Sequence, residues 1–393
     1  MLELWSPDGA FARIEAYLRE NGFFDDAGTP GDGGAPGVGQ AGFRNEGGAP
    51  GARDRVGPDD DRVADLYLGY GLSEPMRRDT TPAPVEPCRL PLAACRIRRR
   101  GDDARLSTPP PFRVGEWQRT WGEAEYGGAV EEVRAAIGRG DVYQVNLVQH
   151  LSAPVSGGAP GVARGVAAAL ARLRPLHARP FVGDGWAIVS ASPELFLARD
   201  GARAWTMPIK GTRPLESTGR LADSTKDAAE HMMIVDLERN DLGRICEPGS
   251  VRCPELMAEH PMAGVRHLVS TVEGCVRDGV TFSDTLAALF PGGSVTGAPK
   301  VAALDHIARL EPVGRGASMG ALGTVRPNGD LRLALTIRTF SIADGRIHLW
   351  VGGGITWDSD PAAEVEESWV KARPLLAAIG SGVPGRARSW AAA

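Results

Sequence analysis

Carboxylates stand three residues apart in two segments of the sequence that have a helical pattern. The segment KDAAEHMMIVDL holds Asp227 and Glu230, and the segment PAAEVEESWVKA holds Glu364 and Glu367, with Lys371 four residues further on. Residues three and four apart share one face of a helix, so each set predicts a cluster of charges. Taken singly, each set indicates a solvated helix face with a salt bridge across one turn.

The two carboxylate sets have a different meaning if their helices converge. Four carboxylates around one point cannot all stay ionised without a cation, and hard oxygen ligands suit Mg²⁺. Because Mg²⁺ keeps waters and also takes substrate anions, such a site would bind an acidic small molecule. Spacing alone leaves open whether the helices meet, and the solvated faces stay as the alternative.

Two basic residues stand where a nucleophile or an anion-binding group could be. Lys210 lies in PIKGTRP, in a chain with few lysines, and is either a surface charge on a loop or a reagent. A neutral lysine amine in a desolvated pocket is a competent nucleophile. Burial would lower the pKa of Lys210 and a neighbouring carboxylate would raise it. Arg338 stands among apolar residues in LALTIRTF and needs a substrate carboxylate or an internal salt bridge.

Two glycine-rich stretches predict places where the backbone comes close to another group. FPGGSVTGAPK, at 290–300, differs from the phosphate-binding pattern G-x-x-x-x-G-K-[ST], because two residues separate Gly297 from Lys300. We therefore expect no nucleotide there, although a glycine turn before a helix can offer N–H groups to a carboxylate. In WVGGGITWDSDP, at 350–361, three glycines leave no Cβ atoms to obstruct a ligand.

These residues lie in a segment of dense periodic structure that follows residue 121. A helical pattern over 128–140 leads into a strand over 141–155, and an apolar run over 331–344 predicts another strand. Asp-Gly dipeptides in ARDGARAW and IADGRIHLW predict tight hairpins between antiparallel strands. We therefore predict an α+β fold, with helices packed on antiparallel sheets, rather than a doubly wound parallel sheet.

The beginning of the chain differs in texture from the rest. An amphipathic helix over 11–20 and short apolar segments between proline-rich stretches predict a small N-terminal lobe over 1–120. From about 27–58 glycine and proline are too dense for regular elements, which predicts a flexible loop within this lobe. A catalytic domain over 121–380 and a flexible tail over 381–393 complete the predicted organisation.

Composition excludes several classes of partner. The 393 residues carry a formal net charge of −5 with 42% hydrophobic residues, which predicts a globular protein that binds neither nucleic acid nor membrane. No run of roughly 18 apolar residues occurs and the N-terminal segment is charged, so we predict a cytoplasmic location. The five cysteines form no C-x-x-C pair, which argues against a disulfide framework and a zinc site.

Eight motifs, which cover roughly residues 123–375, together resemble the chorismate-utilising enzymes and follow that family's order. They are DVYQVNL, SASPELFL, PIKGTRP, AEHMMIVDLERNDLGR, RHLVSTVEG, FPGGSVTGAPK, LTIRTF and GGGITWDSDPAAEVEESWVKA. The family comprises the component I chains of anthranilate synthase and aminodeoxychorismate synthase, and the isochorismate and salicylate synthases. The resemblance implies a large antiparallel β-sandwich flanked by helices, with the active site in a deep cleft between the sheets.

The resemblance also implies how the charged residues would bind chorismate. Glu230 and Glu364 would be the principal Mg²⁺ ligands, supported by Asp227 and Glu367, and the metal would hold the ring carboxylate of chorismate. Arg338 would bind the enolpyruvyl carboxylate.

The remaining site residues follow from the same resemblance. Glu194, in SPELF, would be the general acid that protonates the departing C4 hydroxyl, and His267 would sit beside it. The anion pocket would be completed by Lys371 and by the backbone of Gly211, Thr212 and the glycines from Gly352 to Gly354.

Two positions imply which reaction is catalysed. Members that use water carry a lysine base where this chain has Gln144, and aminodeoxychorismate synthases read PIKGT where anthranilate synthases read PIAGT. Lys210 would attack C2 of chorismate and expel the C4 hydroxyl, with Glu194 as the acid. Ammonia would then add at C4 and release the lysine, which gives 4-amino-4-deoxychorismate, the precursor of p-aminobenzoate for folate or for a secondary metabolite.

The resemblance also implies a partner. None of the five cysteines lies in a G-x-C-x-G elbow, so ammonia would come from solution or from a separate glutamine amidotransferase subunit. Two alternatives stay open, namely anthranilate synthase component I and a non-catalytic subunit that binds chorismate or the amidotransferase as a scaffold. Where the family has a tyrosine in RG-x-Y-x-G, this chain has Ser318, which changes how a substrate would be held.

Overall fold

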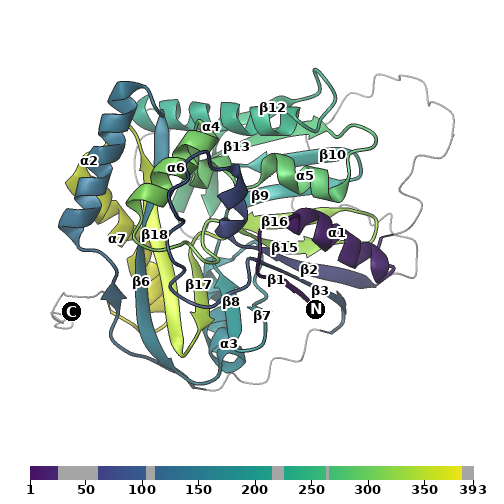
Figure 1. The fold of residues 1–393 in the computed structure, drawn as a ribbon, viewed down its shortest axis with the longest axis horizontal. Coiled ribbons are helices and arrows are strands. Elements are labelled where there is room, and N and C mark those ends of the chain that lie inside the picture. The colour runs from purple at the N-terminus through teal and green to yellow at the C-terminus, as the bar shows by residue number, and fades with distance from the viewer. Residues whose placement is uncertain (25–60, 103–110, 215–224, 263–264, 383–393) are drawn as a thin grey trace.

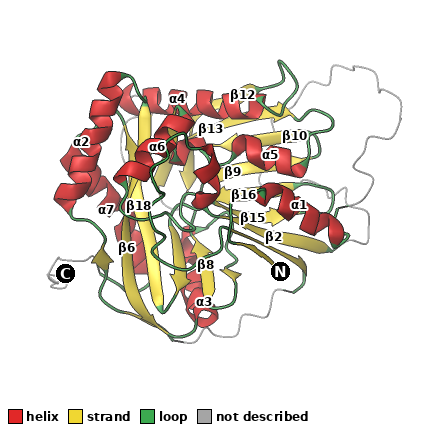
Figure 2. Cartoon of the chain, viewed as in Figure 1, coloured by secondary structure: helices red, strands yellow, loops and turns green. Residues whose placement is uncertain are grey.

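The computed structural model describes residues 1–24, 61–102, 111–214, 225–262 and 265–382. They form two β-sheets with helices packed against them (Figure 1, Figure 2). Every strand pair in these ranges is antiparallel. The predicted α+β class with antiparallel sheets is confirmed.

The larger sheet has ten strands in the order β1-β3-β2-β15-β16-β9-β10-β13-β11, and β12 also pairs with β13. Their bounds are β1 (Leu2–Leu4), β2 (Arg62–Leu68), β3 (Ala93–Arg99), β9 (Leu195–Asp200), β10 (Arg203–Met207), β11 (Ile209–Pro214), β12 (Arg252–Met262), β13 (Val265–Cys275), β15 (Ala321–Val325) and β16 (Leu331–Leu335). Strands β1 to β3 belong to the predicted N-terminal lobe, and they share this sheet with strands from the rest of the chain. The proposed boundary at residue 120 stays a prediction.

The smaller sheet has eight strands in the order β14-β6-β18-β17-β8-β7, with β4 and β5 also paired to β6. Their bounds are β4 (Arg113–Val114), β5 (Gln118–Arg119), β6 (Gln144–Ser156), β7 (Phe181–Val182), β8 (Trp186–Ser190), β14 (Gly297–Ala298), β17 (Thr339–Ala343) and β18 (Arg346–Ile355). Ring contacts between Tyr67 of β2 and Trp186 of β8, with centroids 6.1 Å apart, join the two sheets. The long pair β6 and β18 carries several residues of the predicted site, namely Gln144 on β6 and the glycines from Gly352 to Gly354 on β18.

Helices cover the sheets and carry several of the predicted site residues. Their bounds are α1 (Ala10–Glu20), α2 (Glu123–Arg139), α3 (Ala159–Leu170), α4 (Thr225–Gly243), α5 (Phe282–Leu289), α6 (Lys300–Leu310) and α7 (Pro361–Ala378), with 3₁₀ turns η2 (Tyr70–Met76), η3 (Ala171–Leu173) and η5 (Gly293–Val295). Helix α7 packs on β18 and on α2, α3 packs on β8, and α4 packs on β13 (Figure 1). None of the described helices is long and apolar enough to span a membrane.

Turn residues explain the hairpins that the sequence predicts. Between β17 and β18, Asp344 has φ 53° and Gly345 has φ 71°. Two positive φ values in a two-residue loop give the turn whose twist matches the flanking strands. Gly201, at φ 57°, turns the chain between β9 and β10. Both predicted hairpins are confirmed, whereas the predicted loop over 27–58 and nearly all of the predicted tail lie outside the described residues.

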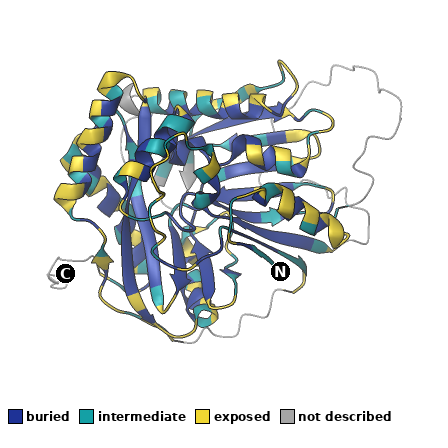
Figure 3. Cartoon of the chain, in the orientation of Figure 1, coloured by how far each residue is buried: buried dark blue, intermediate teal, exposed yellow. Residues whose placement is uncertain are grey.

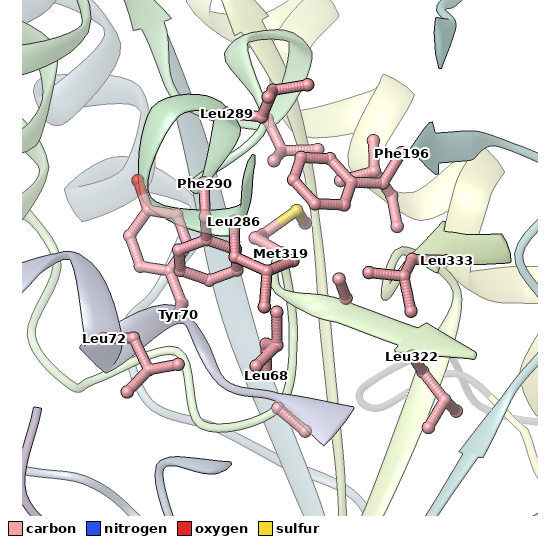
Figure 4. Close-up of a cluster of buried hydrophobic side chains, with 14 of the residues drawn as sticks. Leu68, Tyr70, Leu72, Phe196, Leu286, Leu289, Phe290, Met319, Leu322 and Leu333 are labelled. Atoms are coloured by element: carbon pink, nitrogen blue, oxygen red, sulfur yellow. The ribbon is translucent and has the colours of Figure 1, made fainter. Parts of the chain in front are cut away.

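Strand interiors are buried, and the surfaces of the helices that face away from the sheets are exposed (Figure 3). A buried apolar cluster lies where α5 meets the larger sheet. Figure 4 shows Leu68, Tyr70, Leu72, Phe196, Leu286, Leu289, Phe290, Met319, Leu322 and Leu333. Phe290 packs edge-on against Phe196 of β9, with ring centroids 6.1 Å apart. Because Phe290 directly precedes the stretch PGGS, this cluster anchors the start of the glycine-rich turn.

Candidate active site

Lys210 lies on β11 and directs its ammonium group into the protein. Its Nζ is 2.6 Å from Oε1 of Glu230 on α4, and that oxygen also accepts a hydrogen bond from Nε2 of Gln144 at 3.2 Å. The Lys210 side chain is only 16% exposed. The interpretation of Lys210 as a surface charge is therefore wrong, because the folded chain brings a cation, a carboxylate and an amide together from three elements.

The charge state of Lys210 depends on its neighbours. Burial by itself lowers the pKa of Lys210, but the carboxylates of Glu230, Glu194 and Glu367 together outweigh it and hold the pKa above its ordinary value. The amine is therefore protonated in this arrangement. It must leave Glu230 and lose its proton before it can act as a nucleophile.

A bulge in β11 follows Lys210 directly and requires a glycine. The register against β13 shifts between Lys210 and Thr212, and Gly211 has φ 64°, in the left-handed region that glycine adopts most easily. Nδ1–H of His267 on β13 donates to the Gly211 carbonyl at 3.1 Å. Burial lowers the pKa of His267, so its ring is neutral at pH 7. The side chain of Thr212 lies outside the described residues.

Glu194 lies just before β9 and is a buried residue, only 5% exposed. Its Oε1 accepts a hydrogen bond of 2.9 Å from Oγ of Ser294. Burial raises the pKa of Glu194, and the Ser294 hydroxyl, Lys210 and Arg338 oppose that rise without cancelling it. A raised pKa favours the protonated form that a general acid needs.

Arg338 does not lie inside a strand, contrary to the prediction of one strand over 331–344. It ends a three-residue connection between β16 in the larger sheet and β17 in the smaller one, and has φ 51°. The chain changes sheet here, which a continuous strand could not do. No described residue forms an ion pair with the Arg338 guanidinium. Burial lowers the pKa of Arg338, and the charge of Glu194 opposes that effect without cancelling it.

Two carboxylates of α7 lie beside the glycines of β18. Oε1 of Glu364 accepts a hydrogen bond of 2.6 Å from Ser359, and Glu367 pairs with Lys371 at 2.7 Å. Lys371 also donates to the carbonyl of Gly352 at 2.7 Å. A Cβ atom on Gly353 would lie 3.3 Å from both Glu367 and Lys371 and 3.4 Å from Glu364. The predicted salt bridge across one turn thus exists, although it lies against the backbone of β18.

The next glycine meets a different group of side chains. A Cβ atom on Gly354 would lie 1.9 Å from Nε2 of Gln144 and 2.8 Å from Oε1 of Glu230. Gly353 therefore lies against the α7 carboxylates, and the next residue, Gly354, lies against Gln144 and Glu230. Glycine is needed at position 354 because any side chain would occupy the place of the Gln144 amide.

Comparison with known proteins gives the family of this chain. The family described as chorismate binding enzyme matches residues 85–377. This chain belongs to that family.

Named relatives of the chorismate binding enzymes include two kinds of synthase. The chain is 40% identical over 286 residues to aminodeoxychorismate synthase component 1 of Salmonella typhimurium, which covers 69% of this chain and 61% of that protein. It is 37% identical over 333 residues to anthranilate synthase component 1 of Streptomyces coelicolor, which covers 81% of this chain and 60% of that protein. The chain thus spans about three fifths of the length of these relatives.

Solved structures agree with the fold. Anthranilate synthase component I from Streptococcus pneumoniae matches with a TM-score of 0.70 at 26% identity, over 82% of both chains. The β-sandwich that the resemblance implies is therefore confirmed as the fold of this chorismate binding enzyme.

The metal ligands implied for this chorismate binding enzyme are only partly placed. Within the described ranges, no three His, Cys, Asp or Glu side chains are gathered closely enough to hold a metal ion. The side chain of Asp227 lies outside those ranges. The carboxylate oxygens of Glu230 and Glu364 suit Mg²⁺ chemically, and they lie beside Gly354 and Gly353 of β18. The donor chemistry thus fits Mg²⁺, and the metal site itself stays a prediction.

Sequence reasoning missed Ser294 and Glu238, which lie behind Glu194. The glycine-rich turn does offer an N–H group to a carboxylate, but that carboxylate belongs to the protein, because Gly293 donates to Glu238. The glycines of FPGGSVTGAPK indicated a close approach of the backbone to another group. Glu238, in DLERND, looked like part of a polar helix face. Ser318 is also buried, and its Oγ has no hydrogen-bond partner among the described residues.

Proposed function

We propose that this chain is component I of an aminodeoxychorismate synthase, which converts chorismate and ammonia to 4-amino-4-deoxychorismate with Mg²⁺. The observation that carries the proposal is the position of Lys210, which is buried and paired with Glu230 while its charge also acts on Glu194. A lysine in this position places a nucleophile beside an acid. Gln144 stands where water-using members have a base, which favours an amine over water as the entering group.

Lys210 and Glu194 would divide the first chemical step between them. The neutral amine attacks C2 of chorismate, both ring double bonds shift, and the C4 hydroxyl takes the proton of Glu194 and leaves as water. The proton that the amine loses returns to the Glu194 carboxylate. Ammonia then adds at C4, both double bonds return, and the lysine leaves C2 as the free amine with the proton that ammonia gives up. The enolpyruvyl group stays on the ring, so the product is 4-amino-4-deoxychorismate, the precursor of p-aminobenzoate.

Basic side chains would hold the two carboxylates of chorismate. Arg338 reaches the site from the connection between the sheets and has no ion-pair partner among the described residues, which suits an incoming carboxylate. Lys371 is fixed on the Gly352 carbonyl and adds a second positive charge. Mg²⁺ on Glu230 and Glu364 would neutralise the ring carboxylate. His267, with its proton on Nδ1, keeps the Gly211 bulge in place beside Lys210.

Anthranilate synthase component I is the second candidate function. The relative from Streptomyces coelicolor matches more of this chain than the relative from Salmonella typhimurium does, at similar identity. Anthranilate forms when the amino group enters at C2 and the enolpyruvyl group is lost, which leaves no need for a lysine that occupies C2. The buried Lys210 therefore favours amination at C4.

The ammonia source would be a glutamine amidotransferase subunit, because none of the five cysteines lies in a nucleophile elbow. Purified chain with ammonium salt, chorismate and Mg²⁺ tests the function directly. We expect aminodeoxychorismate, which an added lyase converts to p-aminobenzoate. Fluorescent anthranilate without lyase would instead support the second candidate and refute the first.

The covalent step has its own test. Chain incubated with chorismate and Mg²⁺ but without ammonia should gain the mass of chorismate minus one water, with the added mass on Lys210. As a matched control, Lys371→Ala should bind chorismate more weakly and still carry the adduct on Lys210. Full amination by Lys210→Ala, together with no adduct on the unchanged chain, would show that the lysine is not the nucleophile.

A further inference from the structure

Behind the acid Glu194 lies a buried group of charges that the proposed reaction does not use. Glu238 and Asp241, on one face of α4, are 4% and 3% exposed. Nζ of Lys300, at the start of α6, lies 2.6 Å from Oδ2 of Asp241 and donates to the Leu289 carbonyl at 3.1 Å. Asp241 therefore has its counter-ion. Among the described residues, no lysine or arginine forms an ion pair with Glu238.

The 3₁₀ turn η5 connects this group to the acid. The N–H of Gly293 donates to the Glu238 carboxyl group, and the hydroxyl of the next residue, Ser294, donates to Oε1 of Glu194 at 2.9 Å. A Cβ atom on Gly293 would lie 2.4 Å from Leu237 and 3.3 Å from Oε1 of Glu238, so only glycine lets the turn sit this close to α4. Two consecutive residues of one turn thus hold two buried carboxyl groups.

The surroundings of Glu238 favour its neutral form. Burial raises the pKa of Glu238 to about 8, the Asp241 and Glu194 carboxylates act in the same direction, and Lys300 and the Gly293 N–H oppose them. Three carboxyl groups and one lysine in a buried space cannot all be charged at low cost. Near pH 7 the proton therefore stays on Glu238 while Asp241 pairs with Lys300.

We propose that Glu238 is a positioning residue for the general acid. As a neutral carboxyl group it accepts the Gly293 N–H and so fixes the position of this turn. The fixed turn holds the Ser294 hydroxyl at hydrogen-bond distance from Glu194. It also keeps a second negative charge away while Glu194 gives up its proton to the departing hydroxyl. This inference rests on the acid role proposed for Glu194, and it applies whether amination occurs at C4 or at C2.

Substitutions of Glu238 separate this role from simple packing. Glu238→Gln keeps an acceptor for the Gly293 N–H and stays neutral at every pH, so its kcat at pH 7 should lie within about twofold of the unchanged chain. The unchanged chain should lose kcat as Glu238 ionises around pH 8, and Glu238→Gln should lack that loss. Glu238→Ala leaves the N–H unpaired, and its kcat should fall about tenfold with KM nearly unchanged.

The control is Asp236→Asn on the same helix, whose side chain is 80% exposed and whose pH profile should follow that of the unchanged chain. Rates are measured as chorismate consumption between pH 6 and 9.5. The test of Glu238 therefore does not depend on which product forms, whereas the product decides between the two proposed functions. An alkaline limb of Glu238→Gln that coincides with the unchanged chain would overturn the inference. So would a Glu238→Ala variant that loses thermal stability without losing kcat.

A second measurement needs no turnover. An acid whose pKa is raised on folding stabilises the protein fully below its unfolded pKa, and that stability is lost as pH rises toward the folded pKa. The melting temperature of Glu238→Gln relative to the unchanged chain should therefore rise from pH 5 to pH 8 and then level off. A difference that stays constant over this range would mean that Glu238 is ionised throughout, which also overturns the inference.

Discussion

Gly354 offers a sharp test of how the site is assembled, because one added carbon atom should disturb catalysis more than folding. Gly354→Ala places a Cβ atom 1.9 Å from Nε2 of Gln144 and 2.8 Å from Oε1 of Glu230. Both atoms are ends of side chains, so the backbone of β18 can stay in place while they move away. Gln144 then loses its 3.2 Å hydrogen bond to Glu230, and Glu230 is drawn from Lys210.

The size of the effect follows from that overlap. The Gln144 amide must move about 1.5 Å to reach ordinary contact distance, and displacements of about 1 Å in a site can cost about 10²-fold in rate. We therefore expect kcat/KM for chorismate to fall by about 10²-fold. The free energy of unfolding should fall by only about 1–3 kcal/mol, as for other overpacked interiors.

The neighbouring glycine supplies the comparison. In Gly353→Ala the new Cβ atom meets Glu367, Lys371 and Glu364 at 3.3 to 3.4 Å, so shifts of a few tenths of an ångström suffice. Its loss of kcat/KM should be at least tenfold smaller than that of Gly354→Ala. Steady-state rates and urea denaturation of both variants measure the two effects. If Gly354→Ala keeps the rate of the unchanged chain, or if both variants lose rate equally, the geometry given for Gln144 and Glu230 is wrong.

Three further substitutions test other parts of the structure. Glu194→Gln removes the acidic proton without changing size, and its kcat should fall by about 10²- to 10⁴-fold in the chorismate assay. Lys300→Met leaves Asp241 buried without its counter-ion, and the free energy of unfolding from urea titration should fall by about 3–5 kcal/mol. Burial lowers the pKa of His150 to about 3 and that of His348 to about 4, so both rings are neutral when folded. Their contribution to stability is complete above the unfolded pKa of about 6.5 and is lost as pH falls toward 4, so His348→Gln should reduce the acid loss by on the order of 2–3 kcal/mol.

Each of these has a matched control. Glu131→Gln, on an exposed face of α2, should leave the rate unchanged, and a normal rate in Glu194→Gln would remove it from the acid role. Adding Asp241→Asn to Lys300→Met should recover part of the lost stability, and no recovery would argue against the buried pair. His260→Gln, at a partly exposed histidine, should leave the acid limb as it is, and an identical result for His348→Gln would contradict its buried neutral state.

Features that depend on neighbouring residues could be predicted from the sequence. The Asp-Gly turn at 344 to 345 needs two positive φ values, and the two residues that tolerate them best stand there. The spacing of Glu367 and Lys371 likewise predicted a contact across one helical turn, which forms at 2.7 Å. In both cases the partners are a few residues apart, so the period of a single element is enough to bring them together.

Convergence across the chain could not be predicted from spacing. Gln144, Lys210 and Glu230 meet because three elements pack together, and no period relates their positions. The burial of Glu238 was missed for the same reason, since a charged residue in DLERND looks solvated until the glycine turn packs against it. The resemblance implied an acid role for Glu194, but it carried no information on the charges behind that residue.

The change of sheet at Arg338 has a consequence for how the protein loses activity. Arg338 stands at the step between the sheets, Lys210 belongs to the larger sheet and Gln144 to the smaller one. Any sliding of one sheet over the other changes the distance between these groups while both hydrogen-bonded ladders stay intact. The rate of turnover therefore depends on how the two sheets pack on each other. In mild denaturant it should disappear together with the near-ultraviolet circular dichroism, before the far-ultraviolet signal of the helices and strands declines.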